Sequence, residues 1–173
     1  SGASQSYGYV QHVEHMGGYI SSDTLDFEPR KVALFFNQDI YITGYGAIIK
    51  STDFGKNWIY TDASGDFFTD ITYHRPTATW WTCGYNGSIL ISKDNGMHWE
   101  HYRNGNQILA KRYRLKSIIA VGDYVYAGGD NGAILQLNND NFRSIHINST
   151  SDINFLYPFS QNKILVGGVD GLV

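Results

Sequence analysis

The chain has 173 residues and a formal net charge of −3, which gives no overall attraction to nucleic acid or to an anionic membrane. No apolar run approaches the ~20 residues that span a bilayer, and the lone Cys83 excludes an internal disulfide and a Cys-rich metal site. Aromatic residues reach 15% and glycines number 19, a composition typical of short strands joined by tight turns.

Strand patterns begin near the N-terminus and recur along the chain. Residues 7–15 (YGYVQHVEH) alternate apolar and polar side chains, and residues 18–22 offer further strand material. The next three units span residues 28–65, 66–105 and 113–150, and each contains four short runs rich in β-branched and aromatic residues. These runs are 31–36, 40–43, 48–51 and 58–61; then 67–73, 79–84, 88–92 and 98–102; then 115–121, 124–127, 133–137 and 142–147. Residues 151–173 provide two more runs, 154–159 and 163–167.

A glycine-rich turn marks each unit between its second and third runs. The last glycines of these turns are Gly46, Gly87, Gly132 and Gly171, at intervals of 41, 45 and 39 residues. Four strands in about 40 residues is the size of one blade of a β-propeller. The sequence therefore predicts an all-β chain forming a single domain over residues 1–173, a β-propeller of about four blades, each a four-stranded antiparallel sheet.

An eight-residue pattern, S-x-D-x-G-x-x-W, occurs twice between the third and fourth runs of a unit. Its fixed residues are Ser51, Asp53, Gly55 and Trp58 in the first copy, and Ser92, Asp94, Gly96 and Trp99 in the second. The aspartate can accept hydrogen bonds from backbone N–H groups of the turn, the glycine can adopt a positive φ, and the tryptophan can fill a gap beside the sheet. We interpret both copies as structural turns.

This pattern resembles the Asp-box, or BNR-type repeat, of sialidases, xyloglucan-degrading glycosidases, sortilin-type receptors and photosystem II assembly-factor propellers. The resemblance covers residues 31–173, although the third unit has lost the serine, glycine and tryptophan at residues 137–141. In those families the Asp-box lies on the face opposite the ligand site, which implies that Asp53 and Asp94 are not catalytic. The resemblance also favours an extracellular, periplasmic or virion-surface location, which composition leaves open.

The last unit, residues 151–173, contains only two of the four strands that a blade needs. An open blade exposes an unpaired strand edge. We expect residues 1–27 to supply the missing strands, with residues 7–15 completing the last blade and closing a ring of four blades. The alternatives are a fragment of a larger propeller, or one part of a ring assembled from several chains, including a homo-oligomer.

The candidate binding face carries the glycine-rich turns and the connections between units. The turn residues on it are Tyr45, Tyr85, Asn86, Asp130 and Asn131, and the long connection between the second and third units adds Lys111, Arg112 and Tyr113. Basic side chains beside aromatic ones suit a partner that carries carboxylates or phosphates. The ordinary interpretation, a solvated loop and turn residues chosen for backbone reasons, remains open.

Catalytic patterns are weak in this sequence. The carboxyl candidates Asp66, Asp70, Asp123 and Asp130 give no reason to be paired across a glycosidic bond. The histidine pairs 12/15 and 98/101 are three residues apart, which places them on opposite faces of a strand and makes them poor chelating pairs. No motif requires a metal or a cofactor. In the Trp80-Trp81 pair one ring faces each side of the sheet, and one of them is a candidate sugar platform.

Two functions follow from these patterns. The first is a non-catalytic interaction propeller that presents one face to a protein or glycan partner. The second is part of a glycan-acting enzyme, sialidase- or xyloglucanase-like, or a viral or secreted glycan-receptor-binding domain. Two carboxyls facing each other across the channel would favour the enzyme, and an aromatic and basic rim without them would favour the binder.

Overall fold

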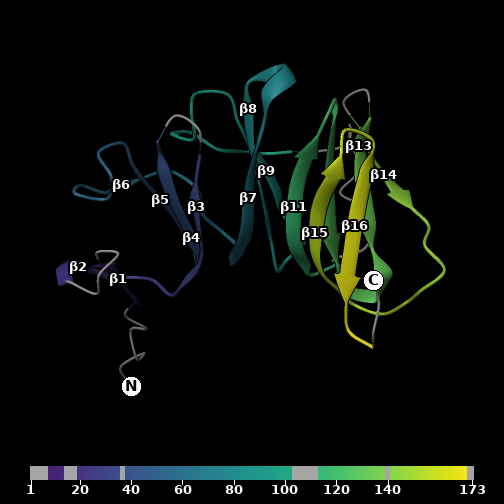
Figure 1. Ribbon diagram of the computed structural model, residues 1–173, viewed down its shortest axis with the longest axis horizontal. Coiled ribbons are helices and arrows are strands. Elements are labelled where there is room, and N and C mark those ends of the chain that lie inside the picture. The colour runs from purple at the N-terminus through teal and green to yellow at the C-terminus, as the bar shows by residue number, and fades with distance from the viewer. Residues whose placement is uncertain (1–7, 14–18, 36–37, 103–112, 139–140, 171–173) are drawn as a thin grey trace.

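The computed structural model describes residues 8–13, 19–35, 38–102, 113–138 and 141–170, and these residues form an all-β structure (Figure 1). Three four-stranded sheets, which we call blades, form its centre. Blade 1 contains β3 (Pro29–Leu34), β4 (Ile40–Gly44), β5 (Ala47–Ser51) and β6 (Ile59–Tyr60). Blade 2 contains β7 (Phe68–His74), β8 (Thr79–Gly84), β9 (Ile89–Ser92) and β10 (Glu100–His101). Blade 3 contains β11 (Leu115–Val121), β12 (Tyr124–Gly129), β13 (Ile134–Asn138) and β14 (Asn141–Ile145).

Two further sheets each contain two strands among the described residues. The N half-blade consists of β1 (Gly8–Val13) and β2 (Tyr19–Leu25), and the C half-blade of β15 (Ile153–Ser160) and β16 (Lys163–Gly168). Every strand pair in the five sheets is antiparallel, and the three blades follow the chain order from first to fourth strand. The prediction of an all-β fold with four-stranded antiparallel blades is confirmed. Within the described ranges, no helix is long and apolar enough to cross a membrane.

The repeat predicted from the sequence is visible in the structure as a register shift at the start of the first strand of each unit. Register shifts occur at Pro29/Lys31, Phe68/Asp70, Leu115/Ser117 and Ile153/Phe155, so the same irregularity recurs in all three blades and in the C half-blade. Each of these places also receives one equivalent backbone hydrogen bond, from the N–H of Tyr45, Tyr85, Asp130 or Val169. The acceptors are the carbonyl oxygens of Glu28, Phe67, Arg114 and Asp152. The glycine-rich turn of each unit is thereby fixed beside the start of its own first strand.

The core lies between successive sheets and not within any one of them. Trp80 belongs to the buried cluster between blades 1 and 2, and Trp81 to the cluster between blades 2 and 3. The two rings therefore face opposite sides of the sheet, as strand alternation requires. Only 1% of Trp80 and 2% of Trp81 is exposed, so the hypothesis that one of them is a sugar platform is wrong.

The N half-blade does not lie where the strand pattern alone led us to expect it. β1 and β2 pair with each other, and Val10 and Leu25 pack with Ile42 and Ile49 on the side of blade 1 that faces away from blade 2. The C half-blade is a separate sheet that packs on blade 3, and Figure 1 shows the two half-blades on opposite sides of the molecule. Among the described residues, β1 pairs with β2 and Val10 packs with blade 1, and no pairing of residues 8–13 with the C half-blade is present.

Candidate functional site

The predicted turn residues of three units lie at one end of the sheets, which we call the turn face. Chain direction in an antiparallel meander requires this, since the turns between second and third strands all occur at the same end. The backbone hydrogen bonds of Tyr45, Tyr85 and Asp130 to the residues that precede β3, β7 and β11 fix the position. Lys111 and Arg112 lie outside the described residues. Tyr113 is half-buried and packs against the cluster between blades 2 and 3.

An aromatic strip joins two of the predicted residues across blades 1 and 2. The Phe67 ring lies 6.1 Å from that of Tyr45 and 4.9 Å from that of Tyr85, measured between ring centroids. Tyr45 is 68% exposed, while Phe67 and Tyr85 are half-buried. Sequence reasoning missed Phe67, although its place directly before the first strand of a unit was a usable signal. The strip gives the turn face a rigid apolar surface with two hydroxyl groups.

Asp66 fixes the turn that carries Tyr85 and Asn86. Its carboxylate accepts hydrogen bonds from the N–H of Asn86 at 2.9 Å and from the N–H of Ser88 at 3.3 Å. A Cβ at position 84 would lie 2.5 Å from this carboxylate, so Gly84 leaves the room that Asp66 occupies. Asp66 is buried, and it is therefore used as a structural acceptor. Asn86 keeps an exposed side chain, and only its backbone is committed.

Asp130 and Asn131 belong to a charged cluster between blade 3 and the C half-blade. The Lys116 Nζ lies 2.8 Å from Asp130 Oδ1 and 2.9 Å from Asp152 Oδ2, and the N–H of Asn131 donates to Asp152 Oδ1 at 2.9 Å. Burial alone would lower the pKa of Lys116, but its hydrogen bonds to the two carboxylates and their charge raise it. The backbone hydrogen bond from Asn131, together with Lys116, lowers the pKa of Asp152. Asp130 and Lys116 therefore already have charged partners within the chain.

A groove of about 550 Å³ runs along the first strands of all four successive sheets. It is lined by residues 30–35, 69–72, 116–119 and 154–158. The register shifts at the start of these strands place Arg30 and Lys31 at its turn-face end, and both are exposed. Since bulges turn side chains away from the regular alternation, this repeated irregularity gives the groove its polar mouth.

Asp70 links three of the groove strands. Its Oδ2 accepts hydrogen bonds from the Ser117 hydroxyl at 3.0 Å and from the Ile118 N–H at 3.1 Å, while Lys31 Nζ lies 3.4 Å from Oδ1. The Ser117 oxygen in turn accepts from the N–H of Leu156 at 3.1 Å. The carboxyls of Asp66 and Asp70 are thus both held in internal contacts. Neither is presented as one of two facing acids.

The opposite end of the sheets, which we call the repeated-turn face, carries the two S-x-D-x-G-x-x-W turns. In the first turn Ser51 Oγ donates to Asp53 Oδ1 at 2.8 Å, and the same oxygen accepts from the N–H of Gly55 at 2.8 Å. The second turn repeats both contacts with Ser92, Asp94 and Gly96, at 2.8 and 3.0 Å. The aspartates also accept from the backbone N–H four residues later, at 2.9 Å in each turn. Through these hydrogen bonds the serine and aspartate side chains stabilise the turn that contains them.

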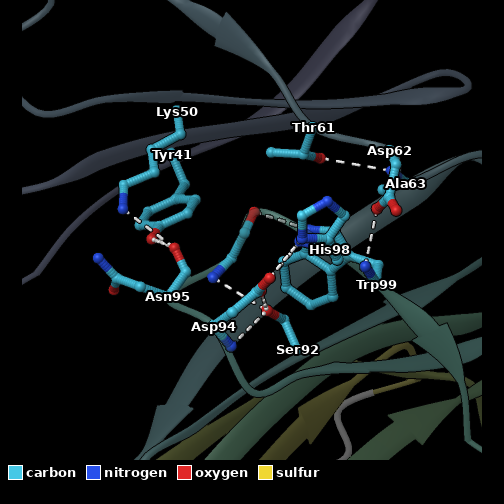
Figure 2. Close-up of polar contacts among 11 residues, drawn as sticks. Tyr41, Lys50, Thr61, Asp62, Ala63, Ser92, Asp94, Asn95, His98 and Trp99 are labelled. Atoms are coloured by element: carbon cyan, nitrogen blue, oxygen red, sulfur yellow. Dashed lines mark hydrogen bonds and ion pairs between the residues drawn. The ribbon is translucent and has the colours of Figure 1, made fainter.

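The second turn is also fastened to blade 1, as Figure 2 shows. Tyr41 Oη and Lys50 Nζ both donate to the backbone oxygen of Asn95, at 2.8 and 3.0 Å. Lys50 Nζ lies 2.8 Å from Asp39 Oδ2, and the side chain of Asn95 donates to that same oxygen at 3.1 Å. Lys50 is 3% exposed and Asp39 6%, so this is a buried ion pair at the junction of two blades. Burial, followed by the charge of Asp39, raises the pKa of Tyr41.

The two repeated turns differ in the side chain that contacts the aspartate four residues before it. Asn57 donates its side-chain N–H to Asp53 in the first turn, and this hydrogen bond is the largest cause that lowers the pKa of Asp53 to about 2. His98 occupies the equivalent position and contacts Asp94 through Nδ1 (Figure 2). This hydrogen bond and the charge of Asp94 raise the pKa of His98 above 6.5. Burial favours a higher pKa for Asp94, but the hydrogen bonds from His98 outweigh it and keep that pKa below 3.8.

Replacing His98 with asparagine should remove a pH-dependent part of the stability. A raised folded pKa means that protonated His98 stabilises the fold fully below pH 6.5, and that this contribution is lost as pH rises through the folded value. The thermal midpoint of the wild type, minus that of His98→Asn, should therefore decline above pH 6.5. The decline will be small because both side chains lie at the surface. His74, whose pKa burial lowers, contributes equally to both proteins and cancels. A difference in thermal midpoint that stays constant with pH would contradict the stabilising contact between protonated His98 and Asp94.

Two larger hollows, each of about 920 Å³, lie at the repeated-turn face. One is bordered by Arg75, Tyr124 and Gln161, and the other by His74, Trp81 and Tyr102. None of the predicted turn-face residues that the structure describes lines either hollow. Within the described ranges, no three His, Cys, Asp or Glu side chains are grouped closely enough to hold a metal ion.

Comparison with known proteins gives structural matches only. No family model matches this sequence, and no curated protein matches it as a relative. Among solved structures, YCF48 bound to D1 peptide matches with a TM-score of 0.64 at 13% identity, over 94% of this chain and 50% of that one. YCF48 from Cyanidioschyzon merolae matches with a TM-score of 0.59 at 16% identity, over 82% of this chain and 41% of that one. A gluconolactonase from Xanthomonas campestris matches with a TM-score of 0.58 at 11% identity, over 81% of this chain and 54% of that one.

The chain therefore spans about half the length of the structures it matches. Structural matches at sequence identities of 11–16% support a shared fold and no shared function. The matched proteins are β-propellers, and the repeated four-stranded sheets, their shared register shifts and the cores between them are those of the same fold. The chain has the β-propeller fold.

Proposed function

We propose that this chain is a non-catalytic propeller that binds a protein partner at its turn face. The observation that carries the proposal is the aromatic strip of Tyr45, Phe67 and Tyr85 beside the polar mouth of the groove, where Arg30 is exposed. Tyrosine and arginine are the residues most often found at the energetic centres of protein interfaces. YCF48, a protein of the same fold, has been solved with a D1 peptide, which supports a peptide-like partner.

The chemistry of the site suggests what the partner segment contains. The strip offers apolar rings for an apolar or aromatic side chain, and Arg30 and Lys31 offer positive charge for a carboxylate. Asp70 neutralises part of the charge of Lys31, so Arg30 is the more important cation. An extended segment with acidic and apolar residues fits these features. We also propose Lys111 and Arg112, in the basic connection between the second and third units, as cations that bind the acidic residues of the partner.

The alternatives make different demands on the site. A glycan partner would need rings that lie open to a sugar, a role that Tyr45 can serve and that the buried Trp80 and Trp81 cannot. A glycan-acting enzyme would need two facing carboxyls, and the internal contacts of Asp66 and Asp70 give that alternative no support.

The test is selection from a phage-displayed library of random linear peptides, followed by affinity measurement on the enriched sequences. Enriched peptides should be acidic and apolar, and their binding should weaken as salt is raised. Tyr45→Ala and Arg30→Glu should each weaken binding by about tenfold or more. Neither should change the melting temperature, because both side chains are exposed.

Lys56→Glu is the matched control, since Lys56 is an exposed cation on the repeated-turn face. It should leave binding unchanged. If Lys56→Glu abolishes binding while Arg30→Glu does not, the partner binds the opposite face and the proposal fails. Binding on a glycan array, with no peptide enriched, would replace the protein partner with a glycan.

A further inference from the structure

We propose that the hollow between blades 2 and 3 at the repeated-turn face binds a small, uncharged aromatic molecule that accepts one hydrogen bond. This hollow, which we call the junction hollow, has a volume of about 920 Å³. Trp81, Ile91 and Tyr102 of blade 2 and Leu137 of blade 3 are among the residues that line it. Because the junction hollow lies at the end of the sheets opposite the turn face, this proposal does not depend on the protein partner proposed above.

The junction between blades 1 and 2 has a repeated turn at the corresponding place. Tyr41 Oη and Lys50 Nζ of blade 1 donate to the backbone oxygen of Asn95, which belongs to the second repeated turn. A Cβ on Gly96 would lie 2.6 Å from the Tyr41 ring, so the turn lies directly against blade 1. A turn of one blade therefore covers part of the blade before it.

Strand register identifies the equivalent place on blade 2. Ser51 and Ser92, the first residues of the two repeated turns, pair with Ile40 and Trp80. Aligning the two blades on these serines gives three equivalent pairs: Asp39 and Thr79, Tyr41 and Trp81, and Lys50 and Ile91. The three residues that this alignment assigns to blade 2 all line the junction hollow.

The connection between the third and fourth strands of blade 3 is too short to form a repeated turn. β13 and β14 are paired as far as Asn138 and Asn141, and two residues separate these in the sequence. In blade 2, seven residues separate Ser92 from Glu100. The space that a repeated turn fills in the first junction is therefore open in the second.

The inner lining of the junction hollow suits an uncharged occupant. Thr79 and Ile91 stand in place of the buried ion pair of blade 1, and they carry no charge. A charged group placed against them would lose its hydration without gaining a partner. Lys93 and Glu100 lie 4.0 Å apart and are both exposed, so they form part of the rim. Aromatic and apolar side chains with a few placed polar groups are typical of sites for small organic molecules.

His74 provides the junction hollow with one buried polar group. It is 4% exposed, and its Nε2 has no hydrogen-bond partner among the described residues. His74 lies opposite Thr79 at the end of the first strand, and Phe35 in blade 1 and Val121 in blade 3 occupy the equivalent position. Blade 2 therefore has a polar side chain where blades 1 and 3 have apolar ones, and this side chain lines the hollow.

A chain of hydrogen bonds assigns the ring hydrogen of His74 to Nε2. The Trp81 indole N–H can only donate, and it donates to Thr79 Oγ1 at 2.9 Å. Thr79 Oγ1 lies 2.7 Å from Thr77 Oγ1, which lies 2.7 Å from His74 Nδ1. If each hydroxyl donates toward His74, every hydroxyl hydrogen has an acceptor and Nδ1 accepts the last one. The reverse direction leaves the Thr79 hydrogen without an acceptor among the described contacts.

The ring of His74 is also uncharged. Burial lowers its pKa, and the nearby backbone of Gly122 and Asp123 only partly offsets that effect. A neutral ring with its hydrogen on Nε2 offers one donor. An aromatic ligand with one acceptor atom would pair with a buried N–H that otherwise has no partner.

The test is a titration of the isotope-labelled 173-residue chain with quinoline and with naphthalene, followed by nuclear magnetic resonance at about pH 8. The two compounds have the same shape and are uncharged at this pH, but only quinoline has an acceptor atom. Both should shift the ring signals of His74 and the indole signal of Trp81. Quinoline should bind about three- to tenfold more tightly, which is the value of one net hydrogen bond.

Variants separate the hydrogen bond from the space. His74→Phe, which introduces the residue that blade 1 has, should bring the two dissociation constants to about the same value and retain naphthalene binding. His74→Gln keeps an N–H donor and should keep a preference for quinoline. Leu137→Trp should weaken binding of both compounds about tenfold or more, because the larger ring occupies the hollow.

Leu165→Trp is the matched control, since Leu165 lies on β16 and does not line the junction hollow. It should leave both affinities unchanged. Near-ultraviolet circular dichroism shows whether each variant is folded. Equal affinity of the wild type for the two compounds, an unchanged preference in folded His74→Phe, or His74 and Trp81 signals that do not move at saturating quinoline would overturn the proposal.

Discussion

Replacing Lys50 with methionine should lower the free energy of unfolding by about 3–5 kcal/mol, because it leaves a buried carboxylate without its cation. Lys50 Nζ lies 2.8 Å from Asp39 Oδ2, and the side chains are only 4% and 8% exposed. Methionine matches the length of the lysine stem, so the change removes charge and hydrogen bonding with little change in volume. The Nζ also donates to Asn95 at 3.0 Å and lies 5.4 Å from the centre of the Tyr41 ring, and both contacts are lost as well.

Urea unfolding of single and double variants measures this effect. Adding Asp39→Asn to Lys50→Met removes the remaining charge and should recover much of the loss, since the cost comes mainly from the unpaired carboxylate. Lys93→Met is the matched control: Lys93 lies 4.0 Å from Glu100, with both side chains more than 65% exposed, and it should change stability by less than about 0.5 kcal/mol. A Lys50→Met loss as small as that of Lys93→Met would show that the buried pair does not stabilise the junction.

The fold could be predicted because its signal is local and repeated. Glycine turns at near-constant spacing and alternating strands identify the blades, and each turn recurs in the structure with the same backbone hydrogen bond. The position of the N half-blade could not be predicted in this way. Strand alternation shows that Val10 and Leu25 need an apolar partner, but it does not say which sheet provides it. Blade 1 provides it, through Ile42 and Ile49.

The candidate site was predicted in part for the same reason. Turn position alone placed Tyr45 and Tyr85 at one end of the sheets, whereas their junction through Phe67 depends on contacts between blades. Contacts between side chains of different units could not be predicted from the sequence. Lys116 meets Asp152, 36 residues away, and Asp70 meets Ser117, 47 residues away. A register shift also breaks strand alternation near Asp70. Strict alternation along the sequence therefore assigns side chains near Asp70 to the wrong side of the sheet.

The second large effect is expected at the tryptophans of the repeated turns, and it should differ between them. Trp99 is 8% exposed and lies in the cluster between blades 1 and 2, so Trp99→Ala should cost about 3–5 kcal/mol of unfolding free energy. Trp58 has the equivalent position in blade 1, but it is only half-buried against the N half-blade, which has two strands instead of four. Trp58→Ala should therefore cost less, about 1–3 kcal/mol.

Phenylalanine substitutions separate hydrogen bonding from volume at these two positions. The Trp99 indole N–H donates to the Gly96 carbonyl oxygen at 3.0 Å, whereas the Trp58 indole N–H is buried without a hydrogen-bond partner among the described residues. Trp99→Phe loses a made hydrogen bond and leaves the carbonyl unpaired, while Trp58→Phe removes a donor that was already unsatisfied. Chemical denaturation should thus show Trp99→Phe to be about 1–2 kcal/mol more destabilising than Trp58→Phe. Equal losses would mean that the two tryptophans stabilise their turns through volume alone, and that the indole hydrogen bond to Gly96 contributes nothing measurable.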